Sequence, residues 1–337
     1  MNKSLVTGGA GFIGSHVVDE LVNMNHQVVV LDNLSGGFIE NLNPEAEFVD
    51  GDIVDNTLIG NIFQEYCFDY VFHLAAYAAE GLSQFIKRYN YANNLIGSVN
   101  LINSSINSNT VRCFVFTSSI AVYGSNQLPM IEEMKPAPED SYGIAKYAIE
   151  QELGVSHQLF GLPYIIFRPH NVYGERQNIG DPYRNVLGIF MNQAMLGEPF
   201  SIYGDGAQTR AFSHIDDVAP IIARSIDFPD AYNQIYNVGA DIPYSINELA
   251  GHVADAMGVE LRIKYLDSRH EVLHAYSSHT KARNTFKGLF KDITLDVGIK
   301  RMADWAKKHG SQETKPFTNI EVTKNLPASW STFLEEA

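Results

Sequence analysis

The sequence predicts an α/β fold: a Rossmann-type, doubly wound parallel sheet joined to a smaller, mostly helical C-terminal substrate domain. Short apolar segments alternate with helix-length segments through the first half of the chain, a pattern typical of a parallel sheet covered on both faces. Glycines at positions 8, 11 and 14 stand between the first strand and the first helix. Beyond residue 175 this alternation gives way to a segment rich in Gly, Asn, Pro and aromatic residues, which indicates a second domain.

The N-terminal strand, turn and helix predict a dinucleotide site. Residues 2–7 are expected to form a buried strand, residues 11–24 a helix and residues 26–31 a second strand. The first glycine permits a tight turn, the second lets backbone approach a pyrophosphate, and the third allows the helix to pack on the strand. Asp32 then ends the second strand, where a carboxylate accepts from the adenosine ribose hydroxyls and repels a 2′-phosphate. The expected cofactor is therefore NAD rather than NADP.

The following segments continue the sheet. Further strands are expected at residues 47–50, 70–74, 112–117 and 164–168, and long helices at 83–108 and 142–160. After the third strand, Asp52 is placed to accept from the adenine amino group while Ile53 packs on the ring. The small residues that follow His73 let backbone lie against the cofactor. The apolar residues of the two long helices fit either a dimer face or contacts that cover the sheet.

The C-terminal half has a different pattern. A helix is expected at 186–196, and a helix at 216–226 with a strand at 234–238 is expected to return to the sheet. From Ser245 onward the pattern is helical with short strands, and the tail after His309 is polar with no assigned role. Because 337 residues exceed the usual size of one core, we expect two domains. They are an NAD-binding domain over 1–174, with 213–240 returning to it, and a non-contiguous substrate-binding domain over 175–337.

Composition and charge exclude several classes of protein. A formal net charge of -15 with no cluster of Lys and Arg argues against a nucleic-acid partner. No apolar run approaches ~20 residues, so neither a membrane span nor a signal peptide is expected. Cys67 and Cys113 lack metal-ligand spacing and fall in apolar stretches, which indicates buried free thiols and a reducing, cytoplasmic compartment. No metal site is expected, because the histidines show no ligand spacing with carboxylates; they are His73, His170, His214, His252, His270, His274 and His279.

The segment Tyr142-Gly-Ile-Ala-Lys146 predicts redox chemistry on an alcohol. A tyrosine and a lysine four residues apart on a helix share one face, so the ammonium is expected to favour phenolate over phenol. Tyr142, ordinarily near a pKa of ~10, would then act as a base near neutrality. Ser119, at the end of another strand, would hold the substrate oxygen while Tyr142 takes its proton.

These motifs, in this order and spacing, resemble the extended short-chain dehydrogenases/reductases, the family of NAD-dependent nucleotide-sugar epimerases and dehydratases such as UDP-hexose 4-epimerases. The resemblance covers residues 1 to about 309. Its motifs are Thr7 to Gly14, Asp32-Asn-Leu, Gly51-Asp-Ile, His73-Leu-Ala-Ala, Thr117 to Gly124, Tyr142 to Lys146, Arg168 to Gly174, and Ile202-Tyr-Gly-Asp-Gly with Arg210.

The resemblance implies a role for each matching position. It implies the catalytic residues Ser119, Tyr142 and Lys146. For the NAD cofactor it implies Gly8, Gly11, Phe12, Ile13, Gly14, Asp32, Asn33, Ser35, Gly36, Asp52, Ile53, Leu74, Ala75, Ala76, Asn94, Thr117, Tyr142, Lys146, Pro169 and His170. For a nucleotide sugar it implies Glu80, Ser119, Tyr142, Asn171, Asn185, Tyr203, Arg210 and Arg269, the arginines suiting diphosphate oxygens. A homodimer is also expected.

The residues beside Ser119 favour 4-epimerization. Related 4,6-dehydratases and uronate decarboxylases carry acidic residues after the serine or threonine, and 3,5-epimerases a cysteine, whereas this chain has Ile120 and Ala121. A dehydratase, a 4-keto-sugar reductase or dehydrogenase on the same triad, or a non-catalytic NAD-sensing module are the alternatives. Glu80 and Ala211 depart from the common epimerase pattern and leave the sugar open.

The position that gates the C2 substituent of the sugar can be counted in two ways. Counting back from Lys281 selects Ala275, which leaves room for an N-acetyl group, and counting forward from Arg269 selects Tyr276, which would block it. We favour Ala275, because Thr280-Lys281-Ala282 opens a helix and gives the firmer anchor. The expected substrates are therefore plain and N-acetylated hexose nucleotides.

Overall fold

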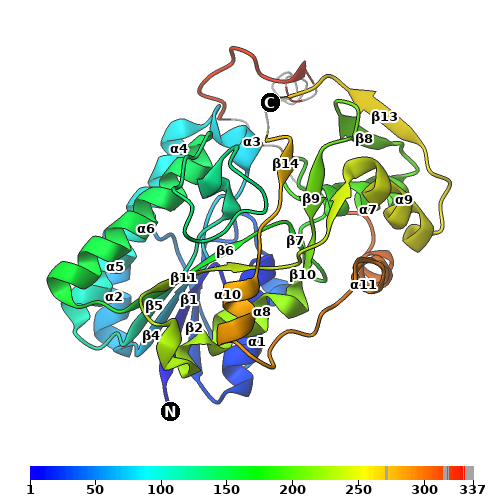
Figure 1. Ribbon diagram of the computed structural model, residues 1–337. Coiled ribbons are helices and arrows are strands. Elements are labelled where there is room, and N and C mark those ends of the chain that lie inside the picture. Colours follow the sequence, from blue (N-terminus) through cyan, green and yellow to red (C-terminus); the bar gives the residue numbers. More distant parts are fainter. Residues whose placement is uncertain (270–271, 314–316, 318, 329, 331–337) are drawn as a thin grey trace.

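A seven-stranded parallel sheet forms the centre of the protein (Figure 1). The computed structural model describes residues 1–269, 272–313, 317, 319–328 and 330. The strand order is β11-β6-β5-β4-β1-β2-β3, and the order reverses between β1 and β4. This is the Rossmann arrangement, in which ligands bind at the carboxyl ends of the strands beside the reversal. The strands are β1 (Lys3–Thr7), β2 (Gln27–Asp32), β3 (Glu47–Asp50), β4 (Tyr70–His73), β5 (Cys113–Thr117), β6 (Tyr164–Pro169) and β11 (Gln234–Val238).

Helices cover both faces of the sheet, because successive apolar residues of each strand point to opposite faces. Val6 packs in one core cluster with α1 (Phe12–Asn23) and α8 (Ala219–Arg224). Leu5 packs in another, with α2 (Asn56–Tyr66), α5 (Gly97–Ser108) and α6 (Ser141–Phe160). Burial of each such side chain contributes about 1.5–3 kcal/mol.

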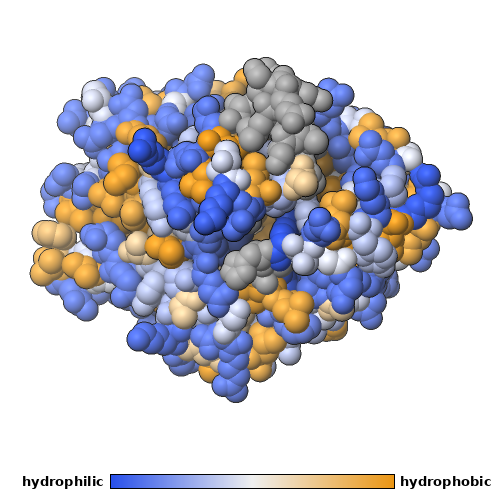
Figure 2. All heavy atoms as spheres, turned by 90° about the horizontal axis from the view of Figure 1, so that it is seen from above, coloured by the Kyte–Doolittle hydropathy of each residue, from blue (hydrophilic) through white to orange (hydrophobic). Residues whose placement is uncertain are grey.

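The outer side of α6 remains apolar as well. Its buried residues Ile149 and Leu153 face the sheet, while Val155, Leu159 and Phe160 are 48%, 69% and 63% exposed. Figure 2 shows apolar side chains on the left of the molecule, where α5 and α6 lie in Figure 1. The helix therefore covers the sheet and still presents an apolar face.

The long helix expected over residues 83–108 is only partly correct, because the segment is broken between Ser83 and Lys87. It consists of α3 (Glu80–Ser83), α4 (Lys87–Tyr91), a π-helical turn (Ala92–Ile96) and α5. The break falls where the carbonyl of Phe85 accepts hydrogen bonds from the backbone N–H groups of Glu321 and Val322. A partner from the far end of the chain thus takes a carbonyl that a continuous helix would use.

The helix expected at 216–226 is also shorter than expected. A 3₁₀ turn (Ile215–Asp217) precedes α8 and another (Ser225–Asp227) follows it. The carboxylate of Asp217 accepts from the backbone N–H groups of residues 291–293, which ties this turn to a distant loop. Cys113 is buried as expected, but Cys67 is exposed, because it ends α2 in a left-handed conformation with φ 50°.

The second region packs three helices beside the carboxyl edge of the sheet. These are α7 (Val186–Leu196), α9 (Ile246–Met257) and α11 (Leu295–His309), which share one apolar core. The short strands are β7 (Val172–Tyr173), β8 (Phe200–Tyr203), β9 (Thr209–Ala211), β10 (Ser213–His214), β12 (Pro243–Ser245), β13 (Ile263–Leu266) and β14 (His274–Ala275). The remaining helix α10 (Thr280–Thr285) contacts β11, so this region and the sheet are interleaved.

After α11 the chain returns across the top of the molecule toward α3 and α4 (Figure 1). Phe317 and Trp330 pack into an apolar cluster with residues of the broken helix segment. Among the helices that the structure describes, none is long and apolar enough to cross a membrane.

Candidate active site

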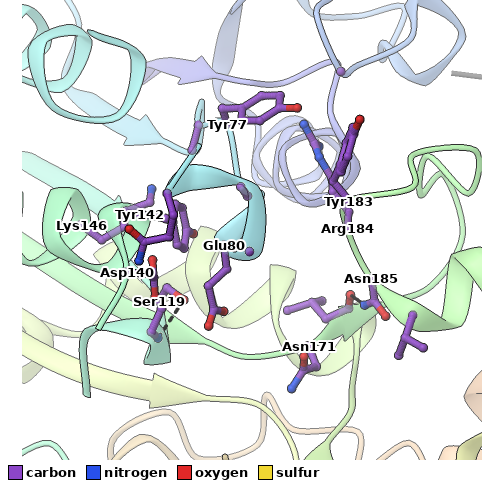
Figure 3. A pocket seen from close by; sticks show the side chains of 18 of the residues that line it. Tyr77, Glu80, Ser119, Asp140, Tyr142, Lys146, Asn171, Tyr183, Arg184 and Asn185 are labelled. Carbon is purple, nitrogen blue, oxygen red and sulfur yellow. Dashed lines mark hydrogen bonds between the residues drawn. The ribbon is translucent and has the colours of Figure 1, made fainter. Parts of the chain in front are cut away.

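One large cavity lies at the carboxyl ends of the strands and collects nearly all the predicted site residues. Its volume is about 1090 Å³. Every residue expected to bind cofactor or substrate lines it except Asn94. Figure 3 shows Ser119, Tyr142 and Glu80 pointing into one space, with Asn171 and Asn185 on its far side. Ligand pockets commonly reach ~300–1,000 Å³, so this cavity has room for more than one nucleotide.

The glycine turn after β1 has no space for side chains. Gly8 has φ +73°, and a Cβ there would lie 2.7 Å from the backbone nitrogen of Ala75. A Cβ on Gly14 would lie 2.0 Å from the carbonyl oxygen of Gly8, so α1 can approach β1 only without one. Gly11, Phe12 and Ile13 at the start of α1 also line the cavity. These amides at a helix N-terminus suit a pyrophosphate.

Asp32 is held rigidly beside this turn. Its carboxylate accepts from the backbone N–H of Ala10 at 3.0 Å and of Leu34 at 2.8 Å. Burial raises the pKa of Asp32, and these hydrogen bonds oppose the rise. Nearby, Asn33 donates to Asp52 at 2.9 Å, which links two of the residues expected at the adenosine end.

The cavity fits an NAD molecule on a further observation. The hydroxyl oxygen of Thr117 is buried, lines the cavity and has no hydrogen-bond partner among the described residues. A buried hydroxyl without a partner costs ~1–3 kcal/mol, so a ligand atom is expected to satisfy it. Together with the glycine turn and Asp32, this hydroxyl defines an elongated site along the strand ends.

The catalytic residues meet where β5 and α6 face the cavity. Ser119 follows β5 and accepts from the backbone N–H of Ala121 at 3.1 Å, and it also hydrogen-bonds Tyr142. Lys146 donates to the carbonyl of Thr117 at 2.8 Å, and its ammonium lies 5.7 Å from the ring centre of Tyr142. The expected convergence of a hydroxyl, a phenol and an amine is therefore present.

The charges around Tyr142 bear on the expectation that Lys146, together with the positive nicotinamide, keeps this phenol ionised. Burial raises the pKa of Tyr142 above its ordinary value, and the carboxylates of Glu80 and Asp140 raise it further, while the bond from Ser119 lowers it. Burial also lowers the pKa of Lys146 to about 7, although the charge of Glu150 opposes this shift. Without a cofactor these shifts favour the neutral phenol of Tyr142, and the positive charge of a bound nicotinamide would favour phenolate.

A buried ion pair supports the catalytic residues from behind. Arg168 donates to Glu150 through Nε at 2.9 Å and through a terminal nitrogen at 2.5 Å. Ser118 donates to the same carboxylate at 2.5 Å, and Arg168 also donates to the Tyr123 hydroxyl at 2.7 Å. Ser118 precedes Ser119 and Glu150 follows Lys146 by one helical turn, so this network fixes both catalytic segments.

Pro169 and His170, expected beside the nicotinamide, both line the cavity; Pro169 ends β6 and His170 follows it. The ring of His170 bonds the carbonyl of Ala211 at 3.0 Å and the ring of His279 at 3.0 Å. Burial lowers the pKa of His170 to about 3, so this imidazole is neutral. His279 in turn bonds the partly exposed carboxylate of Asp241 at 2.7 Å.

The residues expected to hold the sugar diphosphate lie on the opposite wall. Asn171, with φ 39°, donates to the carbonyl of Ala211 at 3.2 Å, and Asn185 donates to that of Val172 at 2.6 Å while capping α7. Arg210 donates to the carbonyls of Thr209, Leu273 and Val272, and the guanidinium of Arg269 stacks on the Tyr203 ring at 4.4 Å. The two arginines thus bring positive charge to this end of the cavity.

Asn94, expected among the cofactor residues as the asparagine that orders the helix on the cofactor side, acts on the backbone and does not reach the cavity. It lies in the π-helical turn and exchanges hydrogen bonds with the backbone of Tyr77 at 2.8 and 3.0 Å. It is buried, and it does not line the cavity. Asn94 therefore positions the loop after β4, while its neighbour Asn93 reaches the cavity.

Several cavity residues were not expected from the sequence. Tyr77, Asp140, Tyr183 and Arg184 line the cavity (Figure 3). Arg184 pairs with Asp181 at 3.0 Å and stacks on Tyr77 at 5.5 Å. A Cβ on Gly36 would lie 2.9 Å from its guanidinium, so Arg184 reaches across from the substrate side to the loop after β2. In the sequence, Arg184 could have been predicted to line the cavity from its position directly before Asn185.

No cluster of three metal-ligating side chains occurs in the part of the chain that the structure describes. His270 lies outside the described residues. Of the two residues counted for the C2 position, Ala275 lines the cavity and Tyr276 is not among the lining residues.

Comparison with known proteins gives one family. The model of the NAD dependent epimerase/dehydratase family matches residues 4–239. A UDP-glucose 4-epimerase from Mycolicibacterium smegmatis is 34% identical over 313 residues, covering 90% of this chain and 98% of that protein.

Two solved structures are similar throughout. A UDP-glucose 4-epimerase with UDP-glucose from Thermotoga maritima has a TM-score of 0.87 at 35% identity, covering 91% of this chain and 99% of that one. A UDP-N-acetylglucosamine 4-epimerase from Methanobrevibacter ruminantium, in complex with UDP-N-acetylmuramic acid, has a TM-score of 0.84 at 31% identity and covers 92% and 99%. The fold, the glycine turn and the matched sequence agree, and this chain belongs to the NAD dependent epimerase/dehydratase family.

Proposed function

We propose that this protein catalyses the NAD-dependent 4-epimerization of a UDP-hexose through a transient 4-keto sugar. The observation that carries the proposal is the meeting of Ser119, Tyr142 and Lys146 in a cavity whose adjoining wall consists of Ile120 and Ala121. Neither adjoining side chain can act as an acid or a base. The three catalytic residues therefore support proton transfer at one hydroxyl. Inversion at C4 needs this proton transfer and a hydride carrier, and no further acid or base.

The mechanism follows from the charges around Tyr142. NAD, held by the glycine turn, Asp32 and Thr117, would supply a hydride acceptor and a positive charge beside the phenol. Tyr142 takes the proton from the C4 hydroxyl, Ser119 holds the sugar oxygen, and Lys146 stabilises the phenolate. The keto sugar, held through its diphosphate by Asn171, Asn185, Arg210 and Arg269, rotates and presents its other face. Tyr142 then returns the proton to the C4 oxygen. The hydride that NAD would have accepted from C4 would return to the opposite face of C4, which inverts the configuration.

The carboxylates near Tyr142 favour a neutral sugar over a uronate. Glu80 and Asp140 line the cavity and raise the pKa of Tyr142, and the guanidinium of Arg184 lowers it by a smaller amount, so the charge near this phenol is on balance negative. The C6 carboxylate of a uronate lies next to C4 and would meet like charge there. We therefore propose that UDP-glucose and UDP-galactose react, and that UDP-glucuronate reacts poorly.

The small side chain of Ala275 favours acceptance of N-acetylated sugars as well. Ala275 lines the cavity on β14, next to Arg210 on β9. Ala275→Tyr should abolish turnover of UDP-N-acetylglucosamine while sparing UDP-glucose, and Tyr276→Phe is the matched control. Equal loss of both substrates in Ala275→Tyr would contradict this role.

Proton NMR of the sugar product tests the main proposal. Incubation with UDP-glucose should give UDP-galactose, with the C4 configuration changed and C6 intact. A 4-keto-6-deoxy product would instead identify a dehydratase, and stoichiometric NADH release would identify a dehydrogenase. Gel filtration distinguishes an epimerase from a dehydrogenase or reductase by whether NAD stays bound to the protein. NAD should stay bound to an epimerase, because an epimerase regenerates its cofactor in each turnover and has no need to exchange it.

A homodimer in the cytoplasm is the remaining proposal. The exposed apolar residues Ile144, Val155 and Leu159 share one face of α6 at spacings of eleven and four residues. Burial of this apolar face against the same face of a second copy would remove it from water, which supports a homodimer. We also propose that the chain consists of two domains, one that binds NAD and one that binds the substrate. Sedimentation analysis of the wild type and of Leu159→Glu tests the dimer.

A further inference from the structure

The chain is longer than the relatives described above. They are covered over 98–99% of their own length, yet they cover only 90–92% of this chain. The part of this chain that the relatives do not cover is therefore about as long as the 28 residues that follow α11. We define the C-terminal segment as Phe317, residues 319–328 and Trp330, the part of this tail that takes up the contacts below.

The C-terminal segment is bound through the backbone of the broken helix. The carboxylate of Glu321 accepts from the N–H groups of Arg88 at 2.9 Å and Tyr89 at 3.1 Å, at the start of α4. The backbone N–H groups of Glu321 and Val322 donate to the carbonyl of Phe85 at 2.8 and 3.2 Å. Four hydrogen bonds therefore satisfy the groups that the break exposes.

Aromatic contacts hold the segment at two further points. The ring of Phe317 lies 4.8 Å from that of Tyr89 and 5.5 Å from that of Tyr77. Trp330 is only 4% exposed, and its ring lies 5.2 Å from Tyr183 and 6.1 Å from Phe85. A Cβ on Gly81 would lie 3.4 Å from the Trp330 ring, so a glycine in α3 permits this close approach.

The same segment forms part of the cavity wall. Its lining residues are Val322, Lys324, Asn325, Pro327, Ala328 and Trp330. Trp330 lies between Gly81, which follows Glu80, and Tyr183, which precedes Arg184 and Asn185. Glu80 points into the same space as Ser119 and Tyr142 (Figure 3), so this wall stands over the sugar half of the cavity.

We propose that the C-terminal segment is the outer wall of the nucleotide-sugar site, and that Trp330 is a residue that determines substrate affinity by contacting the bound nucleotide sugar and fixing the Glu80 segment. This inference rests on the proposed function, since it takes a nucleotide sugar as the occupant. The wall contacts parts of the substrate that do not react, so it binds ground state and transition state alike. Its loss should therefore raise KM and leave kcat nearly unchanged.

Tryptophan emission tests the contact directly. The chain contains two tryptophans, and Trp305 lies on α11, stacked on His309 and not lining the cavity. In the Trp305→Phe variant all tryptophan emission comes from Trp330, and the addition of UDP-glucose should change the intensity of this emission saturably. In Trp330→Phe the remaining emission should not respond. Absence of a response in Trp305→Phe at saturating UDP-glucose would overturn the inference.

Kinetics test the consequence for binding. Trp330→Ala should raise KM for UDP-glucose about tenfold, with kcat within about threefold of wild type. Glu321→Ala, which changes an exposed side chain and only loosens the docking at α4, should raise KM by a smaller factor. Unchanged KM in both variants, with the wild type active, would refute the wall while leaving the epimerase function intact. A wild type that binds UDP-glucose by emission but yields no epimer would refute the function and leave the wall intact.

Discussion

Neutralising Glu150 should cost more stability than any exposed substitution on the same helix. Glu150 accepts two hydrogen bonds from Arg168 and one from Ser118, at 2.5 to 2.9 Å, and both charged side chains are almost fully buried. In Glu150→Gln one of these donors meets the amide nitrogen, and the buried guanidinium loses its counter-charge. Breaking a buried pair in this way costs about 3–5 kcal/mol, a large part of the ~5–15 kcal/mol that a folded domain has.

Urea unfolding gives the free energy of unfolding for this test. The matched control is Glu152→Gln, an exposed carboxylate on α6, which should change stability by less than about 0.5 kcal/mol. The double variant Glu150→Leu with Arg168→Met should recover most of the loss, because no unpaired charge remains buried. A Glu150→Gln protein as stable as Glu152→Gln, or a double variant no better than the single one, would refute the reasoning.

Three further outcomes are expected. Tyr142→Phe should lose ~10²- to 10⁴-fold in kcat while its circular dichroism and cofactor content stay unchanged, and activity within a few-fold of wild type would contradict its role as the base. Calorimetry on cofactor-free protein should find NAD bound far more tightly than NADP, and Asp32→Ala should narrow that difference, whereas equal affinities in the wild type would exclude the role of Asp32. Lys146 has a pKa of about 7 in the folded protein and ~10.4 when unfolded, so between these values the unfolded chain binds the extra proton and stability rises with pH. The free energies of unfolding of wild type and Lys146→Met, measured in urea at pH 7.5 and 9, should therefore diverge in favour of wild type, by up to about 1.4 kcal/mol per pH unit. A difference between the two proteins that stays constant with pH would show that Lys146 does not titrate there.

The sequence predicted the sheet and the cofactor end because their signals are local. Gly8 and Gly14 are required by backbone contacts within one strand-turn-helix unit, and Asp32 ends the strand that the apolar pattern defines. The catalytic positions were recognisable for the same reason, since Tyr142 and Lys146 lie four residues apart on one helix.

The features that were missed depend on residues far apart in the chain. The break after α3 arises because Phe85 finds backbone partners in the C-terminal segment, which its own neighbours do not reveal. Asn94 serves the backbone of Tyr77 rather than the cavity, and this follows only from where the π-helical turn lies. The raised pKa of Tyr142 comes from burial and from two carboxylates, of which Glu80 is distant in the chain and close in space, while Asp140 lies two residues before Tyr142.

The docking of the C-terminal segment has a consequence for the order of folding. Arg88 and Glu321 are separated by 233 positions, so their contact closes a very long loop, whereas the strands of the sheet pair with much nearer partners. Contacts between residues so far apart in the chain stabilise the protein only after the entropy cost of ordering the intervening chain has been met. The Rossmann sheet should therefore form first, with an open groove along its strand ends. Pulse-labelling hydrogen exchange should find the amides of Glu321 and Val322 among the last to gain protection, at the moment when the sugar site acquires its outer side.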